Sequence, residues 1–242
     1  MQAVILAGGA GTRLRSIVND RPKSMARFGD KPFLEYQIDT LRRHGVTEVI
    51  LCVGYLHEHI EQHFGDGKRC GIPVQYSVES TPLGTGGAVR KAGNLLRDSF
   101  LLLNGDSYVE LNVEAFIAAH AAHRQSDERV VGTLALTRVE DARAYGSVEM
   151  DRQQRIVHYR EKSTSQSPWV SAGIYALERN ILDGWPPDRA MSMENDVIPT
   201  ALESGGALFG HPAGGFFVDI GTPEGHSRFR EYIEGNGYGH SQ

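Results

Sequence analysis

Short apolar runs alternate with helix-like segments over the first half of the chain. Residues 4–6, 49–53 and 100–103 are continuously apolar, and each run stops at or near a glycine. Residues 74–78 predict a further strand of similar length. Strands that are apolar at every position are typical of a parallel sheet buried on both faces, because no position along them faces water. The first half therefore predicts a parallel sheet.

Amphipathic segments lie between these strands. Leu34, Ile38 and Leu41 recur at the spacing of one helix face, and residues 57–64 and 84–96 predict two further helices. Helices between parallel strands cover both faces of a sheet, which predicts an α/β fold. In such folds the ligand binds beyond the carboxyl ends of the strands, and this is where the glycines of this chain follow.

The second half of the chain is richer in predicted strands. The pattern favours strands at 130–136, 146–150, 156–159, 170–177 and 216–220. One helix is marked by Met193, Val197, Ile198, Ala201 and Leu202, and a last helix is expected at 222–233. We interpret residues 1–234 as a single domain whose two halves, about 1–125 and 126–234, share one sheet. The polar tail at 235–242 is expected to be flexible.

The charge and hydropathy of the chain exclude several kinds of partner. The 242 residues carry 25 basic and 30 acidic side chains, a formal net charge of −5. A nucleic-acid-binding domain usually carries a basic stripe, so this balance argues against nucleic acid. The amino-terminal apolar run is too short for a signal peptide, and no apolar stretch approaches the roughly 18 residues of a membrane helix. These features predict no membrane partner and a cytoplasmic location.

Cysteines and histidines offer little support for a soft metal site. The two cysteines, Cys52 and Cys70, are too few for a zinc cage and are interpreted as reduced thiols. His57, His59 and His63 fall on one predicted helix without a carboxylate in a supporting position. We interpret these three histidines as surface residues.

A glycine-rich loop follows the first strand directly, at residues 6–14. Gly8, Gly9 and Gly11 let the backbone approach a ligand and turn N–H groups toward phosphate oxygens. The loop is not a dinucleotide fingerprint, because the third glycine of that motif would fall on Leu14. It is not a P-loop, because no Lys-Ser or Lys-Thr directly follows its last glycine. A tight turn is the alternative interpretation.

Two cations follow in and after the glycine loop. Arg13 and Lys23 lie ten positions apart. A triphosphate needs cations at its β and γ groups, for which arginine supplies a planar fork and lysine a mobile point charge. Either residue alone could be a solvated surface cation. Beside the glycine loop, the pair favours a nucleoside triphosphate as the ligand.

Six motifs of this chain resemble, in order, those of the sugar-1-phosphate nucleotidyltransferases. They are the glycine loop with Pro22-Lys23, then residues 83–88, 104–106, 145–146 with 161–162, 171–175 and 218–223. The resemblance covers about residues 2–233. It implies a Rossmann-like α/β fold with a mixed, mainly parallel sheet flanked by helices. It also implies that the first half binds the nucleotide and the second half the sugar phosphate.

The resemblance assigns roles to individual residues. It implies that Arg13 and Lys23 are catalytic cations and that Asp106 and Asp219 share Mg²⁺. It implies nucleotide binding by Leu6, Ala7, Gly8, Gly9, Gly11, Thr12, Glu79, Gly84, Thr85 and Gly86. It implies binding of the sugar phosphate by Gly146, Glu161, Lys162, Ser171 and Gly173. Without the resemblance, the aspartates could be turn or capping residues, and Glu161-Lys162 a solvated pair.

The implied reaction joins a nucleoside triphosphate to a sugar 1-phosphate and releases pyrophosphate. Two polyanions must meet, so positioning and charge neutralisation are the main requirements and no protein nucleophile is needed. Residues 15–36 and 82–87 look most similar to D-glycero-D-manno-heptose 1-phosphate guanylyltransferases, which implies GTP and a heptose 1-phosphate as substrates. One departure is Ser24, where the family usually has a second proline.

Three alternatives stay open at this point. An enzyme for another sugar 1-phosphate, of the mannose, glucose or MurNAc type, would carry the same motifs. A non-catalytic regulatory subunit that binds an NDP-sugar is expected to have lost Lys23, Asp106 or Asp219, and all three are present. The oligomeric state is open too, including a homo-oligomer.

Overall fold

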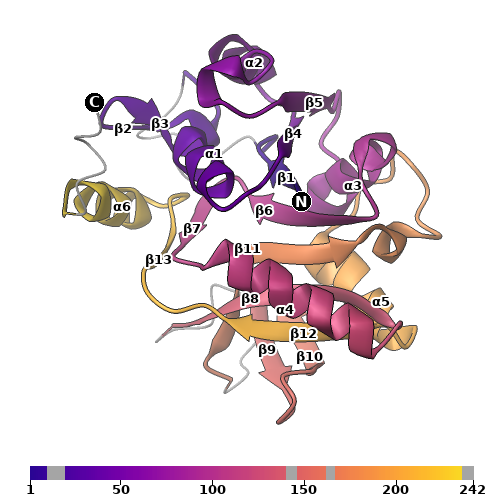
Figure 1. Ribbon diagram of the computed structural model, residues 1–242. Coiled ribbons are helices and arrows are strands. Elements are labelled where there is room, and N and C mark those ends of the chain that lie inside the picture. The colour runs from indigo at the N-terminus through magenta and orange to yellow at the C-terminus, as the bar shows by residue number, and fades with distance from the viewer. Residues whose placement is uncertain (10–19, 140–145, 162–166, 236–242) are drawn as a thin grey trace.

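The structure, a computed structural model, describes residues 1–9, 20–139, 146–161 and 167–235 (Figure 1). Its central element is a nine-stranded sheet to which both halves of the chain contribute. Helices cover both faces of this sheet, and the predicted α/β fold is confirmed.

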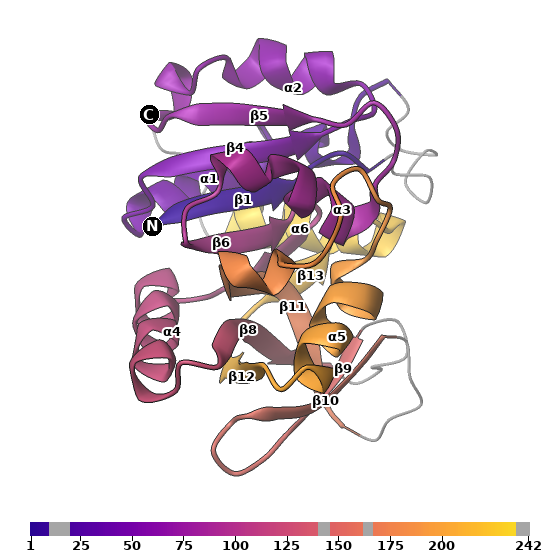
Figure 2. The same cartoon turned by 90° about the vertical axis from the view of Figure 1, so that its right-hand side faces the viewer.

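Four parallel strands form the first part of the sheet. In spatial order they are β6 Ser99–Asn104, β1 Gln2–Leu6, β4 Glu48–Val53 and β5 Val74–Val78, which lie side by side in Figure 2. Side chains along a strand point alternately to the two faces, and here both faces are buried. Ile5 belongs to the core on one face and Val4 to the core on the other. This is why each of these strands except β5 has an almost continuously apolar sequence.

Antiparallel strands extend the sheet on the side of β6. They are β11 Trp169–Glu178, β9 Gly146–Met150, β10 Ile156–Glu161 and β8 Val130–Arg138, and β12 Ala207–Pro212 pairs in parallel with β8. Strand β11 joins the two halves, because it pairs with β6 on one side and with β8 on the other.

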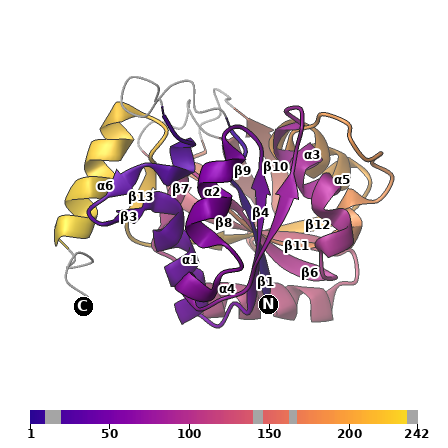
Figure 3. The same cartoon turned by 90° about the horizontal axis from the view of Figure 1, so that it is seen from above.

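The helices form two layers. On one face lie α1 Phe33–Arg43, α2 His57–Phe64 and α4 Val113–Ser126. On the other face lie α3 Gly84–Lys91, a π-helical turn at Met193–Val197 and α5 Ile198–Glu203. Figure 3 shows the sheet between α1 and α2 on one side and α3 and α5 on the other. No helix among the described residues is long and apolar enough to cross a membrane.

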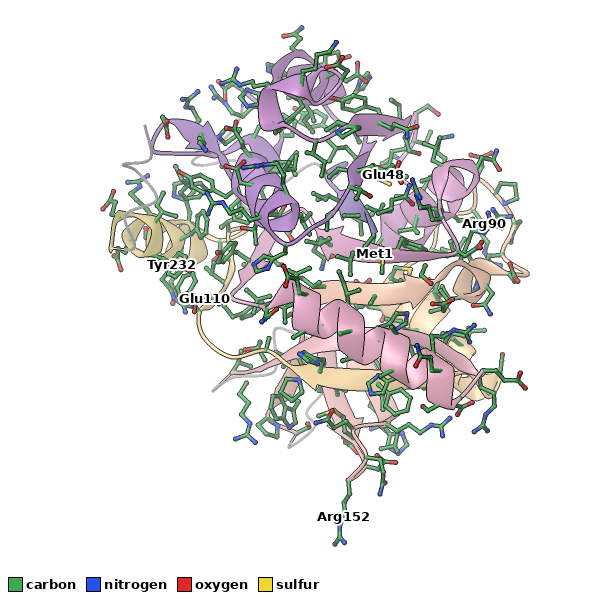
Figure 4. The ribbon with its side chains drawn as sticks, in the orientation of Figure 1. Met1, Glu48, Arg90, Glu110, Arg152 and Tyr232 are labelled. Carbon is green, nitrogen blue, oxygen red and sulfur yellow. The ribbon has the colours of Figure 1, made fainter. Side chains whose placement is uncertain are left out.

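A third core, rich in aromatic residues, holds helix α6 against the rest of the molecule. Two small sheets surround it, β2 Arg27–Phe28 with β3 Lys31–Pro32, and β7 Ser107–Val109 with β13 Phe217–Asp219. Helix α6 Pro223–Gly235 packs Phe229 onto Phe28 and Phe33 of this core. Tyr232 of α6 lies beside Glu110 and donates a hydrogen bond of 2.6 Å to its carboxylate (Figure 4). The carboxylate also accepts from Phe216 N at 2.8 Å, so α6 and β13 are held against the end of β7.

The structure differs from the predicted elements in several places. The strand predicted at 216–220 is only β13, and it pairs with β7 outside the main sheet. The single helix predicted over 193–202 is a π-helical turn followed by α5, and the helix predicted at 84–96 is α3 followed by a 3₁₀ turn at Ala92–Leu95. Helix α4 and the strands β2, β3, β7 and β12 have no counterpart in the predicted pattern.

The absence of α4 and β12 from the predicted pattern has a physical explanation. The buried residues of α4 are Val113, Phe116 and His120, with alanines between them, so its apolar periodicity is weak. Strand β12 contains Gly210 and ends at Pro212, residues that usually signal turns. A Cβ at Gly210 would lie 2.2 Å from Met150 Sδ, so the glycine is needed for close packing, which a local pattern does not reveal.

Candidate active site

A cleft lies at the carboxyl ends of the four parallel strands. It has a volume of about 800 Å³, within the usual range for a small-molecule site. The strands β1, β4 and β5 run outward in one direction and β6 lies on the other side of β1, so the cleft is at the topological switch point of the sheet. Its lining includes Leu6, Gly8, Gly9, Glu79, Gly84, Thr85 and Asp106, all of which are sequence-predicted site residues.

Glu79 lies across two glycines of the cleft. A Cβ at Gly8 would lie 2.7 Å from Glu79 Oε1, and one at Gly54 would lie 2.9 Å from Glu79 Cγ. The other carboxylate oxygen accepts a hydrogen bond of 3.2 Å from Leu83 N. Burial raises the pKa of Glu79 above its usual value. The cleft therefore contains a held carboxylate that can accept hydrogen bonds from a ligand.

The loop before α3 is packed tightly against the loop before α5. Gly84 has a φ of +71°, and a Cβ there would lie 2.5 Å from Met191 O. The N–H groups of Gly86 and Gly87 donate to the same carbonyl at 2.9 and 3.2 Å. The structure thus places Gly86 in a packing contact and outside the cleft lining. Ala7 is likewise buried outside the lining, and its N–H donates to Cys52 O at 2.8 Å.

Cys52 is the thiol that lines the cleft. Burial raises its pKa to about 12. At neutral pH the group is therefore a protonated thiol and a poor nucleophile. Cys52 and Cys70 are both free thiols, as the sequence predicts, and both are buried.

Lys23, Asp106 and Asp219 converge at one end of the cleft. Lys23 Nζ forms an ion pair with Asp106 Oδ2. Strand pairing aligns Asp219 with Ser107, the residue after Asp106, and Ile220 N donates to Asp106 O at 2.8 Å. Residues 106 and 219 are thus brought together by the β7–β13 ladder, although they are far apart in the sequence.

Gly221 completes this cluster, and it is not among the site residues predicted from the sequence. Its N–H donates to Asp219 Oδ1 at 2.6 Å. A Cβ at this position would lie 2.5 Å from Lys23 Nζ and 2.7 Å from Asp219 Oδ1. The glycine therefore leaves the space in which the lysine and the aspartate meet.

The two aspartates fit a magnesium site in which the substrate supplies some of the ligands. Mg²⁺ prefers oxygen ligands and usually takes one or two carboxylates together with substrate phosphates and waters. No group of three His, Cys, Asp or Glu side chains that could hold a metal occurs in the described part of the chain. A softer metal held by the protein alone has no such site among these residues.

The residues of β11 that were predicted to bind the sugar phosphate, Ser171 and Gly173, lie next to the end of β6. Ser171 Oγ accepts from Gly173 N at 3.3 Å and donates to Tyr175 OH at 3.1 Å. Gly173 has a φ of +75°, and a Cβ there would lie 2.9 Å from Asn104 Nδ2. Because Asn104 lines the cleft, Ser171 and Gly173 stand near its border on the side of Asp106.

Glu194 links the two halves of the site and was also missed from the sequence. Its Oε2 accepts from Thr85 Oγ1 at 2.7 Å and from Ser192 Oγ at 3.0 Å. Its Oε1 accepts from Tyr175 OH at 3.2 Å. The carboxylate thus joins the loop at Thr85 to strand β11. The signal in the sequence is the Ser-x-Glu spacing, because Ser192 caps the turn that carries Glu194.

Other predicted residues lie at or beyond the edge of what the structure describes. Glu161 of β10 aligns with Gly146 of β9, and the Glu161 side chain lies outside the described part of the structure. Gly11, Thr12, Arg13 and Lys162 lie outside the described residues.

The interpretation of the α2 histidines needs a correction. His63 contacts Glu35 Oε2 at 2.7 Å, and His57 contacts Glu61 Oε1 at 3.1 Å. Carboxylates do support these histidines, and the one at Glu35 comes from α1, so the linear sequence did not show it. The His63 side chain is only 17% exposed and is therefore not a free surface residue.

Comparisons with known proteins agree with this geometry. A family model described as nucleotidyl transferase matches residues 2–234. The chain is 34% identical to D-glycero-alpha-D-manno-heptose 1-phosphate guanylyltransferase of Campylobacter jejuni, over 95% of this chain and 98% of the relative. It is 32% identical to the enzyme of the same name from Aneurinibacillus thermoaerophilus, over 97% and 99%. It is 35% identical to mannose-1-phosphate guanylyltransferase of Mycobacterium tuberculosis, over 93% of this chain but 62% of that relative.

A solved structure supports the same grouping. The crystal structure of HddC from Yersinia pseudotuberculosis superposes with a TM-score of 0.81 at 31% identity and covers 96% of this chain and 99% of that chain. HddC has also been crystallised with GMP-PN. Together with the family match over nearly all of its length, these likenesses confirm the prediction made from the motifs: the chain belongs to the nucleotidyl transferase family.

Proposed function

We propose that this protein transfers a guanylyl group from GTP to a heptose 1-phosphate, with Mg²⁺ held by Asp106 and Asp219. A phosphate oxygen of the sugar attacks the α-phosphorus of GTP and forms a new phosphorus–oxygen bond. The bond from the α-phosphorus to the bridging oxygen of the β-phosphate breaks, and pyrophosphate leaves with that electron pair. The observation that carries the proposal is the meeting of Lys23, Asp106 and Asp219 at the end of a nucleotide-sized cleft.

The chemistry needs positioned positive charge more than an acid or a base. Magnesium, when bound, would supply a divalent positive charge that stabilises the negative charge of the reacting phosphate groups. Lys23 adds a cation in the same small volume, and Arg13 supplies another to the triphosphate. Lys162 holds the phosphate of the sugar, and Glu161 accepts hydrogen bonds from its hydroxyl groups. Preorganised charges of this kind account for much of the catalysis in transfer reactions between anions.

Glu79 supports guanine as the base. Guanine presents two adjacent donors, N1–H and the N2 amino group, to which a carboxylate offers two acceptors. Adenine has an acceptor at N1 and would face Glu79 with like polarity. Burial of Glu79 disfavours its charged form and raises its pKa. Charge-assisted hydrogen bonds from guanine would offset this cost of burial.

The heptose is supported by the relatives with which the chain shares nearly its whole length. Both heptose 1-phosphate guanylyltransferases are covered over 98% or 99% of their length. A second candidate substrate is mannose 1-phosphate, because the identity to the mycobacterial mannose-1-phosphate guanylyltransferase is 35%. In either case we place the reaction in the cytoplasm, where nucleoside triphosphates are made.

The test is a pyrophosphate-release screen of the purified protein. It crosses GTP, ATP, UTP, CTP and dTTP with the 1-phosphates of D-glycero-D-manno-heptose, mannose, glucose and N-acetylmuramic acid, with Mg²⁺ present. The fastest release is expected for GTP with the heptose. A higher kcat/KM with mannose 1-phosphate would favour the second candidate. Release with no pair would support a non-catalytic NDP-sugar-binding subunit and overturn the proposal.

A further inference from the structure

Gln37 is a buried glutamine on a helix face that is otherwise apolar. It lies on α1 between Leu34 and Leu41, which belong to the core under the sheet, and its own exposure is 4%. Burying an amide costs free energy unless hydrogen bonds replace its contacts with water. A residue of this kind in an apolar layer therefore needs a specific reason.

The amide group of Gln37 holds both ends of the turn that carries Asp106. Its Nε2 donates to Asn104 O at 2.8 Å and to Ser107 O at 2.9 Å. These carbonyls stand on either side of Gly105-Asp106. One side chain thus sets the distance between the end of β6 and the start of β7.

Backbone contacts hold the same turn from other directions. Gly105 N donates to Leu6 O at 3.0 Å, and Asp106 O accepts from Ile220 N at 2.8 Å. Gln37 differs from these contacts because its side chain can be substituted without changing any residue of the turn.

The acceptor half of the same amide is not used. Within the described part of the chain, Gln37 Oε1 is buried without a hydrogen-bond partner. An apolar side chain would avoid this cost, since Leu41, Leu101 and Val109 line the same small cavity. The buried Oε1 without a partner is unfavourable, whereas both N–H groups of Nε2 make hydrogen bonds. We therefore explain the glutamine at this position by the two carbonyls to which Nε2 donates.

We infer that Gln37 is a positioning residue, which orients Asp106 for the metal through the two carbonyls beside it. The inference rests on the proposed function, because it takes Asp106 as a metal ligand. Partners that orient a ligand from outside typically change metal affinity by 10–100-fold when they are removed. Gln37 acts through the backbone of the turn, so we expect an effect near the lower limit, about ten-fold.

The test compares Gln37→Met with Leu41→Ala. Methionine keeps the length of glutamine and removes both donors. Leu41 lies one helical turn further along α1 and lines the same cavity, and its hydrocarbon side chain cannot donate a hydrogen bond to the Asp106 turn, so its truncation is a control for general loss of packing. Mn²⁺ is titrated into each protein with GTP and without sugar phosphate, and the relaxation rate of water protons reports the protein-bound ion. The Mg²⁺ concentration for half-maximal rate is measured in parallel.

We expect the dissociation constant for Mn²⁺ to rise about ten-fold in Gln37→Met and to stay within two-fold of the wild-type value in Leu41→Ala, whatever their melting temperatures. Excess Mg²⁺ should recover part of the rate of Gln37→Met. Equal metal affinity of Gln37→Met and Leu41→Ala would overturn the inference. Failure of both Gln37→Met and Gln37→Leu to fold, with Leu41→Ala folded, would also overturn it, because Gln37 would then serve stability.

Two reference proteins separate this outcome from a failure of the proposed function. Asp106→Asn should weaken Mn²⁺ binding more than Gln37→Met does. If the wild type and Asp106→Asn bind Mn²⁺ equally, Asp106 is not a ligand and the proposed metal site itself is wrong.

Discussion

Lys23 is the residue whose charge the proposed reaction uses most directly. Its Nζ pairs with Asp106, and its side chain is only 13% exposed. We expect Lys23→Ala to lower kcat by about 10²–10³, the usual cost of removing one preorganised electrostatic contact. Lys31→Ala is the matched control, because Lys31 pairs with Asp39 at 2.8 Å outside the cleft lining. Steady-state kinetics with circular dichroism checks this. Near-normal turnover in a folded Lys23→Ala protein would contradict the role.

Glu79 makes a second prediction at this scale, on the choice of base. Inosine lacks the N2 amino group of guanine, so the wild type should prefer GTP to ITP. Glu79→Gln keeps the size of the side chain but replaces one acceptor oxygen with a donor. We expect the ratio of kcat/KM for GTP over ITP to fall by about 10-fold or more, in line with the loss of a hydrogen bond to a charged group. An unchanged ratio would remove Glu79 from the base site.

Among the elements, the junction between β13 and α6 controls the space around Lys23. In Gly221→Ala the new Cβ would lie 2.5 Å from Lys23 Nζ and must displace it or Asp219. The new Cβ clashes only with the ends of flexible side chains, so we expect the protein to fold. We expect kcat to fall about ten-fold or more, which is part of the loss expected when the lysine charge is removed completely. Gly235→Ala is the control, because Gly235 lies at the other end of α6 and a Cβ there would have no described residue within 4 Å. Equal kinetics of the two variants would show that the space at Gly221 is not needed.

The ladder of β7 and β13 makes a further prediction, because it brings Asp106 and Asp219 to one ion. Asp106→Asn and Asp219→Asn should each raise the Mg²⁺ concentration for half-maximal rate and lower the maximal rate. Residues that serve one ion are not additive, so the double variant should lose much less than the product of the two single losses. A magnesium titration of the three variants measures this. Fully multiplicative losses would mean that the two aspartates act independently.

For the whole molecule, buried histidines predict sensitivity to acid. Burial lowers the pKa of His120, His123, His211 and His226 below the ordinary value of about 6.5. The unfolded chain then binds more protons than the folded one just below pH 6.5, so the stability present above this pH is lost as the pH falls. We expect the Tm to fall between pH 7.5 and 5.5, because the unfolded chain takes up protons on these histidines more readily than the folded chain does.

One substitution tests this assignment within the buried cluster. His120 contacts Thr133 Oγ1 and Glu178 Oε1, both at 3.0 Å, and Arg124 lies on the same carboxylate. In His120→Gln the fall of Tm with acidification should be smaller than in the wild type. Scans of thermal unfolding at pH 7.5, 6.5 and 5.5 compare the two, and parallel curves would exclude His120 as a source of the effect.

The local pattern predicted those parts of the fold in which burial repeats regularly. The strand at 74–78 and the helix at 57–64 have the predicted bounds. In the helix, the buried residues Ile60 and Phe64 are four positions apart, and Gly65 follows its last residue. The candidate site was predicted as far as its residues sit in short motifs at strand ends. A parallel sheet places all such ends at one edge, and this brings Leu6, Glu79 and Asp106 to one cleft.

By itself, then, the sequence determined the α/β class, the family and the position of the site at the carboxyl edge of the sheet. Only the tertiary structure showed that Gln37 clamps the Asp106 turn from 67 positions away and that Glu194 meets Thr85 across 109. It also decided that Gly210 lies in a strand and that Gly221 leaves room for Lys23. Periodicity and short motifs reflect interactions between residues that are close in the sequence. The contacts of Gln37, Glu194, Gly210 and Gly221 depend instead on which distant segments the folded sheet brings together. A single hydrogen bond or a missing Cβ between such segments leaves no repeating pattern in the sequence.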